Sequence, residues 1–305
     1  MLRNVVSMIL IASMLLTACG DQNQSVSDAE QTSEKTTAAS KDETNKITSG
    51  KAAESKDVTT DTADDSLDET LNETEETKAS ATSGHETTRE EVVDKTYHMN
   101  SNYVIKPNNE SSSAKVVLLT FDDGPKEEKM ITSLIDTLDK HDAKAIFFVN
   151  GYRVKHQPEL LQLIHERGQI IGNHAWDHED LKKMPQAEAI KQVTDVQQLV
   201  KDIIGEQPQF FRPPFGSGND ALKGAVQQQG MLYMTWSNGS LDWDKSTKNK
   251  PDKVIQNVLD QLHPGSNILM HELPWTVEGL DELLTQLEQK GYSFVDPRAI
   301  EHQTR

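Results

Sequence analysis

The chain has 305 residues, of which 35% are hydrophobic and 26% are charged, and its formal net charge is −18. So low a hydrophobic fraction excludes a chain that is globular throughout. The acidic balance also argues against a nucleic-acid partner, because proteins that bind nucleic acids carry basic surfaces.

The first residues of the chain are typical of a secretory signal. Arg3 supplies positive charge, and an apolar run from Val5 to Leu16 follows it. This run is short for a membrane span but fits the hydrophobic region of a signal peptide. The residues "LTAC" then resemble a bacterial lipobox, which predicts that residues 1–18 are removed and that Cys19 is lipidated. The alternative is a plain secretory signal whose cysteine, the only one in the chain, is incidental.

Residues 19–100 are predicted to be a lipid-anchored, disordered acidic linker rich in Ser and Thr. Positions 20–95 hold 20 acidic and 8 basic residues, with no aromatic residue and no proline. Such a stretch buries too little apolar surface to offset the entropy that ordering would cost. All 16 aromatic residues follow, from Tyr97 onward. The folded domain is therefore expected to begin between positions 97 and 115, and it is assigned to residues 101–305.

Beyond the linker, short apolar runs alternate with longer segments of helical periodicity, which is typical of repeated βα units. Seven strands are predicted, at 115–120, 145–149, 169–171, 209–211, 231–236, 267–270 and 292–295. Amphipathic helices are predicted between them, around 130–138, 160–164, 190–203 and 254–262. This alternation favours an α/β fold, either a parallel barrel or a doubly wound sheet.

Unusual polar residues directly follow five of the predicted strands. They stand in the segments "FDDGP", "NHAWDH", "RPPFG", "NGSLDW" and "HE". In both candidate architectures the loops at the carboxyl ends of the strands carry the chemistry. The five segments are therefore expected to meet on one rim of the domain.

Two adjacent carboxylates, Asp122 and Asp123, would repel each other at a strand end unless a cation lies nearby. His174 and His178 are spaced so that both imidazoles reach one point. Two histidines and a carboxylate that leave one coordination position open form the ligand set of a hydrolytic zinc site. The other carboxylate is then free to accept a proton from water. The alternative is a solvated turn with exposed polar histidines.

Arg212 has a permanently charged fork that suits a carboxylate, so it is expected to orient Asp122 rather than to lie on the surface. The loop that follows is stiffened by a double proline that includes Pro214. The backbone N–H of Phe215 in this loop is a candidate donor to an oxyanion.

His271 follows an apolar strand and is a candidate acid for protonating a leaving amine, although a histidine in such a place is more often a satisfied core residue. Asp242 would raise the pKa of that histidine and fix its tautomer by pairing with it. Trp243 and Leu269 would supply apolar walls, for example around a small acyl methyl group.

Taken together, the motifs resemble those of the polysaccharide deacetylase family, the NodB-homology domains of carbohydrate esterase family 4. "TFDDGP", "HAWDH", "RPPFG", "LDW" and "LMH" occur in the family's order between about residues 115 and 296. The resemblance implies a distorted (β/α) barrel, often with seven strands, and a divalent metal, with zinc expected and cobalt, nickel or manganese as alternatives. The implied roles are Asp122 as base, Asp123, His174 and His178 as metal ligands, Arg212 as tether of the base, Phe215 as oxyanion donor, His271 as acid and Asp242 as its partner.

The resemblance implies hydrolytic removal of N-acetyl groups from N-acetylglucosamine residues of a cell-surface polysaccharide. A lipid anchor on the extracellular face of the bacterial membrane would favour peptidoglycan, and the protein is expected to act as a monomer. Deacetylation of poly-N-acetylglucosamine, a chitin-like chain or O-acetylated xylan remains an alternative, as does a catalytically silent glycan-binding lipoprotein. One position departs from the family, because Gly239 stands where the fourth motif often has an aspartate.

Overall fold

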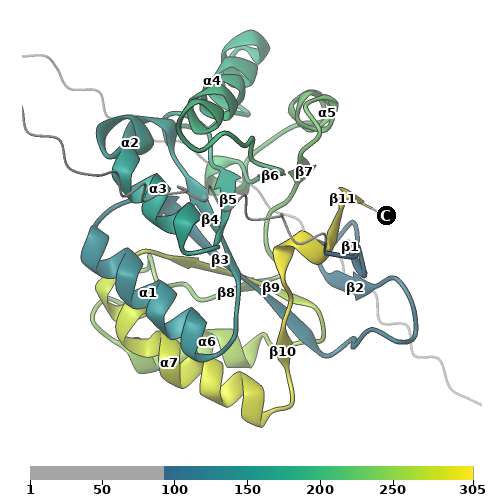
Figure 1. Ribbon diagram of the computed structural model, residues 1–305, viewed down its shortest axis with the longest axis vertical. Coiled ribbons are helices and arrows are strands. Elements are labelled where there is room, and N and C mark those ends of the chain that lie inside the picture. The colour runs from purple at the N-terminus through teal and green to yellow at the C-terminus, as the bar shows by residue number, and fades with distance from the viewer. Residues whose placement is uncertain (1–92, 305) are drawn as a thin grey trace, which may run out of the picture. The chain divides into compact units, whose positions relative to one another are not determined.

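The computed structural model describes residues 93–304, which Figure 1 draws in colour. The predicted signal peptide, Cys19 and nearly all of the predicted linker lie outside the described residues. Among the residues that are described, no helix combines the length and the apolar character needed to cross a membrane.

A curled parallel sheet forms the centre of the domain. Its strands lie in the order β7-β6-β5-β4-β3-β9-β8, and β10 pairs with β3 beside this path. The strands are β3 (Val116–Gly124), β4 (Ala145–Val149), β5 (Ile170–Asn173), β6 (Phe210–Phe211), β7 (Leu232–Tyr233), β8 (Asn238–Gly239), β9 (Ser266–His271) and β10 (Ser293–Phe294). The seven-stranded curl confirms the predicted distorted (β/α) barrel.

The two edges of this sheet are joined by the short segment Met234–Ser237, which runs from β7 to β8. Since an extended residue spans at most about 3.6 Å, so short a segment forces the two edges together and the sheet to curl. The N–H of Met234 donates to Phe211 at 2.9 Å and the N–H of Ser237 donates to Asn267 at 3.1 Å. The prediction of one continuous strand over 231–236 is therefore wrong, because β7 ends at Tyr233 and the chain then crosses to the other edge.

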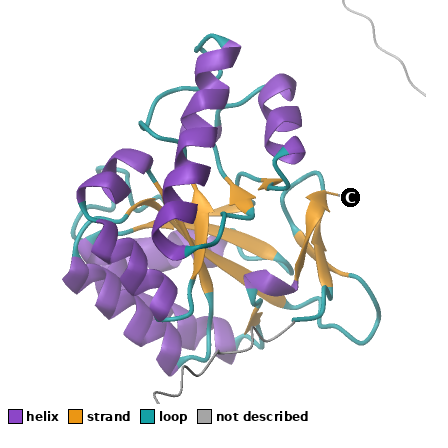
Figure 2. Cartoon of the chain, turned by 45° about the horizontal axis from the view of Figure 1, so that its top comes forward, coloured by secondary structure: helices purple, strands orange, loops and turns teal. Residues whose placement is uncertain are grey.

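Helices surround the sheet, as Figure 2 shows. They are α1 (Glu128–Lys140), α2 (Gly151–His156), α3 (Pro158–Glu166), α4 (Gln186–Ile204), α5 (Asp220–Gln228), α6 (Pro251–Asp260) and α7 (Pro274–Gln289). Around the barrel, α6, α7, α1, α3, α4 and α5 each pack on the next. The four predicted helices correspond to α1, α3, α4 and α6, whereas α2, α5 and α7 were not predicted. Pro251 occupies the first turn of α6, where its missing N–H has no cost.

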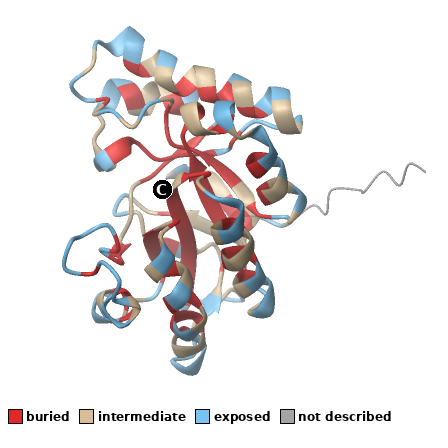
Figure 3. Ribbon diagram, turned by 90° about the vertical axis from the view of Figure 1, so that its left-hand side faces the viewer, coloured by how far each residue is buried: buried red, intermediate tan, exposed pale blue. Residues whose placement is uncertain are grey.

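The central strand β3 is buried on both faces. Val117 and Leu119 pack in the cluster that includes residues of α1 and α7, while Val116 and Leu118 pack in the barrel interior with Phe148. Figure 3 shows the strands buried and the helices exposed on their outer sides. A strand buried on both faces has a continuous apolar run rather than an alternating one, which is the pattern of "VVLL" in β3.

A small second sheet packs into the barrel interior. It contains β11 (Ile300–Thr304), β1 (Tyr97–Met99) and β2 (Ile105–Pro107), in the order β11-β1-β2. Met99, Ile105 and Ile300 are fully buried in the interior cluster. The folded domain therefore includes β1, whose first residue, Tyr97, precedes the assigned start at residue 101.

Candidate active site

The polar segments predicted to share a rim meet in one pocket of about 450 Å³ at the carboxyl ends of the strands. It is lined by Asp122, Asp123, His174, His178, Phe215, Gly216, Trp236, Trp243, Leu269 and His271. Three further predicted residues, Arg212, Asp242 and Pro214, are buried and do not line it. Arg212 binds Asp122 and Asp242 binds His271, so these two buried residues hold residues that line the pocket. Pro214 only forms part of the loop that carries Phe215.

Asp123 lies between two imidazoles at the floor of this pocket. Its Oδ1 is 3.3 Å from His174 Nε2 and 3.2 Å from His178 Nε2. One ligand atom from each of the three residues lies within 4.8 Å of the others. The backbone of Asp123 has φ of 65°, in the left-handed region that non-glycine residues seldom adopt. The turn that places this carboxylate is therefore held against a local conformational preference.

The surroundings of these three side chains fit a divalent cation. Asp123 Oδ1 is buried and has no hydrogen-bond partner among residues 93–304, which is costly for a carboxylate oxygen. The backbone carbonyl of Arg212 lies 2.7 Å from His174 Nδ1. That contact places the imidazole proton on Nδ1 and leaves the Nε2 lone pair directed at Asp123, as in metal-binding histidines. Two imidazoles and one carboxylate match a zinc site that keeps a coordination position open.

The surroundings of Asp123 keep its carboxyl group ionised. Burial by itself would raise the pKa of the Asp123 carboxyl, but contact with His174 and His178 and the nearby charge of His271 hold that pKa well below its ordinary value. The carboxylate is therefore ionised throughout the physiological pH range and available as a ligand.

Asp122 points to the other side of the same turn, against Arg212. Arg212 NH1 donates to Asp122 Oδ1 at 2.6 Å, and both side chains are almost wholly buried. Asp122 Oδ2 faces the metal-ligand cluster, 3.8 Å from His174 Nε2. The adjacent carboxylates thus do not compete for one place, because a fixed positive charge balances Asp122 and the two imidazoles surround Asp123.

Arg212 lies inside the barrel and binds groups on both sides of its open seam, the gap between the edge strands β7 and β8. Besides Asp122, its guanidinium donates to Thr120 Oγ1 at 2.8 Å and to Asn267 Oδ1 at 3.1 Å. Its Nε and NH2 both donate to the Thr235 carbonyl, at 3.1 and 2.8 Å. These bonds tie β3, β9 and the crossing segment together. A buried guanidinium is stable only when its donors are satisfied in this way.

His271 is fixed by a buried carboxylate. Its Nδ1 lies 2.7 Å from Asp242 Oδ1, and its backbone N–H donates to Asp242 Oδ2 at 2.7 Å. Thr276 Oγ1 also donates to Asp242 Oδ2. Burial lowers the pKa of His271, but the hydrogen bond and charge of Asp242 outweigh that effect and leave the pKa above its ordinary value. The imidazole therefore presents its Nε2 side to the pocket and stays protonated to a higher pH.

Aromatic side chains form the rim of the pocket. Phe215 and Trp243 are 64% and 46% exposed, and they are among the three large hydrophobic side chains that the described residues leave exposed. Phe215 packs edge-on to His178, with ring centroids 4.5 Å apart, and Trp243 packs edge-on to His271 at 5.2 Å. Exposed rings beside a polar floor suit a ligand with both apolar faces and hydroxyl groups, such as a sugar.

The position that departs from the family pattern has room for a side chain. A Cβ on Gly239 would meet the indole of Trp236 at 3.6 Å and that of Trp243 at 3.7 Å, which is ordinary van der Waals contact. Gln261 binds both backbone groups of Gly239, so the backbone there does not depend on a side chain. The backbone of the loop is therefore held at Gly239 without a side chain there.

Replacing Gly239 by Ala is expected to raise the free energy of unfolding by about 0.4–1 kcal/mol, because the substitution restricts the unfolded chain and meets no clash in the folded one. Thermal denaturation checks this. A melting temperature below that of the wild type would show that the space beside Trp236 is needed.

Three site residues were not predicted from the sequence. Trp236 and Gly216 line the pocket; Trp236 ends a predicted strand, and Gly216 ends the segment "RPPFG", where it was given no role. Glu272 was quoted in "HE" without a role, yet it is 1% exposed. Burial raises the pKa of Glu272 to about 7, against the opposing influence of Lys126 and Arg153.

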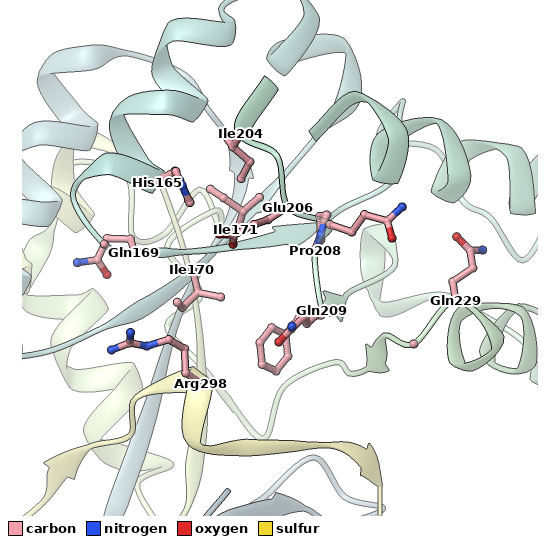
Figure 4. A pocket seen from close by; sticks show the side chains of 14 residues that line it. His165, Gln169, Ile170, Ile171, Ile204, Glu206, Pro208, Gln209, Gln229 and Arg298 are labelled. Atoms are coloured by element: carbon pink, nitrogen blue, oxygen red, sulfur yellow. The ribbon is translucent and has the colours of Figure 1, made fainter. Parts of the chain in front are cut away.

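A larger cavity, of about 550 Å³, lies at the opposite ends of the strands. Figure 4 shows its lining, which includes Gln169 before β5, Ile170 at the start of β5, Gln209 before β6, and Arg298. None of the predicted site residues lines it. Volume alone does not make a site, whereas converging polar groups with shifted pKa values do, so the smaller pocket is the candidate active site.

Comparisons with known proteins show the family to which the chain belongs. Residues 109–234 match the family model described as Polysaccharide deacetylase. The chain is 33% identical over 224 residues to the peptidoglycan-N-acetylmuramic acid deacetylase PdaC of Bacillus subtilis, a match that covers 70% of this chain but 46% of PdaC. It is 37% identical over 189 residues to a peptidoglycan-N-acetylglucosamine deacetylase of Bacillus cereus, covering 59% of this chain and 68% of that protein.

Among solved structures, a CE4 family pseudoenzyme from Bacillus anthracis matches with a TM-score of 0.58 and 27% identity, over 61% of this chain and 66% of the other. A mutant of that pseudoenzyme is described as having restored enzymatic activity. The residues that the family model matches include the acidic turn and the histidine pair. The chain belongs to the polysaccharide deacetylase family of hydrolases.

Proposed function

We propose that this protein is a zinc-dependent deacetylase that removes N-acetyl groups from N-acetylglucosamine residues of peptidoglycan. The observation that carries the proposal is the buried Asp123 Oδ1, which has no hydrogen-bond partner among the described residues and lies between two imidazole nitrogens. Asp122 and His271 flank that point with chemistry suited to a base and an acid. The relatives named as peptidoglycan deacetylases support the choice of polymer.

Asp123, His174 and His178 would hold the cation. When bound, a divalent cation supplies Lewis acidity, which polarises a carbonyl and acidifies water. All other steps fall to side chains of the chain itself. The mixed set of nitrogen and oxygen ligands suits zinc best. Cobalt, nickel or manganese would also fit the same three ligands.

Asp122 is the proposed base. Arg212 holds its Oδ1 at 2.6 Å and leaves Oδ2 toward the ligand cluster, where it can accept a proton from the attacking water. A base held by a buried hydrogen bond does not need to reorient during the reaction.

The backbone N–H of Phe215 is the proposed donor to the oxyanion of the tetrahedral intermediate. Phe215 has φ of 58° within a short 3₁₀ turn, η1 (Pro214–Gly216), so its backbone conformation is fixed by the loop rather than by its own preference. His271, oriented by Asp242, then protonates the departing sugar amine. Trp243 and Leu269 would enclose the acetyl methyl group.

The contrasting proposal is a silent glycan-binding protein, which the pseudoenzyme relative makes a concrete possibility for this fold. A test is acetate release from purified peptidoglycan and from chitooligosaccharides, measured with and without a chelator. Zinc-restorable acetate release from peptidoglycan supports the proposal. Retention of glycan without acetate release would favour the binding protein, and release from the oligosaccharides alone would favour another polymer.

The pKa of His271 provides a prediction for pH dependence. Asp242 raises this pKa, so the protonated acid persists to higher pH than an ordinary histidine would allow. Replacing Asp242 by Asn removes the charge, lowers the pKa of His271 and should move the alkaline limb of the kcat profile to lower pH. A profile of kcat against pH for both proteins checks this. An unchanged alkaline limb would mean that His271 is not the acid.

We further propose that Cys19 is lipidated and that the protein works from the extracellular face of the membrane. The support is the signal-like run and lipobox, which lie outside the described residues. Metabolic labelling with a palmitate analogue is expected to mark the wild type and not the Cys19→Ala variant. Labelling of both would refute the anchor.

A further inference from the structure

Glu272 is a buried carboxylate that the proposed reaction does not use. It follows His271 at the end of β9 but does not line the pocket. Its Oε2 accepts the backbone N–H of Lys126 at 2.8 Å, and its Oε1 is buried with no hydrogen-bond partner among residues 93–304. A carboxylate in such a place is costly, and its contacts lead to the neighbouring site.

Glu272 lies directly against the turn that carries Asp123. A Cβ placed on Gly124 would overlap Glu272 Oε1, closer than real Cβ atoms come, and would fall 3.1 Å from its Cδ, tighter than most real Cβ contacts. The φ of Gly124 is not positive, so the glycine is not needed for its backbone conformation. Glycine is needed here because the Glu272 carboxylate occupies the space of a side chain.

The same turn is held from its other side by Asn150. The backbone N–H of Asn150 donates to the Gly124 carbonyl at 2.9 Å, and its Nδ2 donates to the His174 carbonyl at 2.8 Å. Contacts from Glu272 and Asn150, the residues that follow β9 and β4, thus hold the residues just after Asp123. They also link that turn to the segment that carries a second ligand.

Asp123 needs this support because its positive φ is unfavourable for a residue with a side chain. Such a conformation persists only when neighbouring groups fix the chain on both sides. We infer that Glu272 is a positioning residue whose carboxylate fixes the Gly124–Lys126 turn and thereby aims Asp123 Oδ1 at His174 and His178. This inference rests on the proposed metal site.

The test is the affinity of the purified protein for zinc, measured by competition with a chromophoric chelator. Glu272→Ala is expected to weaken zinc binding roughly tenfold to a hundredfold, the usual effect of losing a residue that orients a ligand. Glu272→Gln keeps an oxygen for the Lys126 N–H and the same shape, so it should restore most of the affinity. Wild-type affinity in Glu272→Ala, or equal loss in both variants, would overturn the inference.

Gly124→Ala provides a second test that leaves Glu272 in place. The new methyl group must displace the carboxylate or the turn, so zinc binding should weaken, and adding Glu272→Ala should then cost little more than Gly124→Ala alone. Losses of affinity that simply multiply in the double variant, or a Gly124→Ala protein with wild-type affinity, would contradict the inference.

Gln169→Ala is a matched control for the loss of a buried polar side chain. Gln169 Oε1 accepts the Ala145 N–H at 2.9 Å, and its Nε2 is buried with no partner in the described chain, as with the two oxygens of Glu272. This variant should melt at a lower temperature but bind zinc as the wild type does. If the wild type itself binds no zinc, the proposed metal site fails together with the inference. If the wild type binds zinc and Glu272→Ala binds it equally tightly, the inference alone fails.

Discussion

Replacing Asp122 by Asn is expected to lower kcat for deacetylation by roughly 10²–10⁴-fold, the usual contribution of a general base. The amide keeps the shape of the side chain and an oxygen for Arg212 NH1, but it cannot accept a proton from water. Zinc content should stay near one per chain, because the three proposed ligands are untouched. Steady-state kinetics and metal analysis of the same preparation check both statements.

Asp123→Asn is the matched control, since the two aspartates are adjacent and the substitution is the same. It should lose zinc as well as activity, because Asp123 is the residue that lies 3.3 and 3.2 Å from the imidazoles of His174 and His178. If Asp122→Asn loses zinc and Asp123→Asn keeps it, the two aspartates have been assigned each other's roles.

Replacing Arg212 by Met should have the largest effect on stability. Removing one partner of a buried ion pair leaves an uncompensated charge and costs about 3–5 kcal/mol in the free energy of unfolding. In a domain of this size, that corresponds to a fall in melting temperature of roughly 6–20 °C. The fall in melting temperature should exceed the fall expected from losing the ion pair alone, because the guanidinium also binds Thr235 and Asn267 across the seam of the barrel.

Arg167→Met is the control for this variant. Arg167 also pairs with carboxylates, Asp136 and Asp139, but on the surface, where such pairs contribute at most about 1 kcal/mol. Its melting temperature should therefore stay within a few degrees of the wild type. Equal melting temperatures for the two variants would contradict the structural role assigned to Arg212.

The sequence predicts much of the fold because strands buried on both faces have continuous apolar runs. The run "VVLL" in β3 and "AIFFV" in β4 are of this kind and could not be mistaken for surface strands. By contrast, β7 and β8 have two residues each, so no periodicity marks them, and the crossing between them was taken for the continuation of a strand. That crossing is fixed by tertiary contacts of Arg212 and Asn267, which a local pattern does not contain.

The candidate site, like the fold, could be predicted from the sequence only in part. Asp122, Asp123, His174 and His178 carry chemistry that a spacing pattern reveals, and the structure brings them into one pocket. Glu272 escaped because a single glutamate after a histidine has no pattern of its own. The only signal was Gly124, whose close neighbour is the side chain of Glu272, 148 positions away in the sequence.

The most direct test of the central proposal is mass analysis of muropeptides from purified peptidoglycan that has been incubated with the zinc-loaded protein. The proposal predicts fragments lighter by one acetyl group, with the free amine on the glucosamine residue, and none when Asp122→Asn replaces the wild type. A free amine on the muramic acid residue would keep the chemistry but change the sugar, in line with the relative PdaC. Fully acetylated fragments after incubation with an intact, zinc-bound wild-type protein would contradict the proposal.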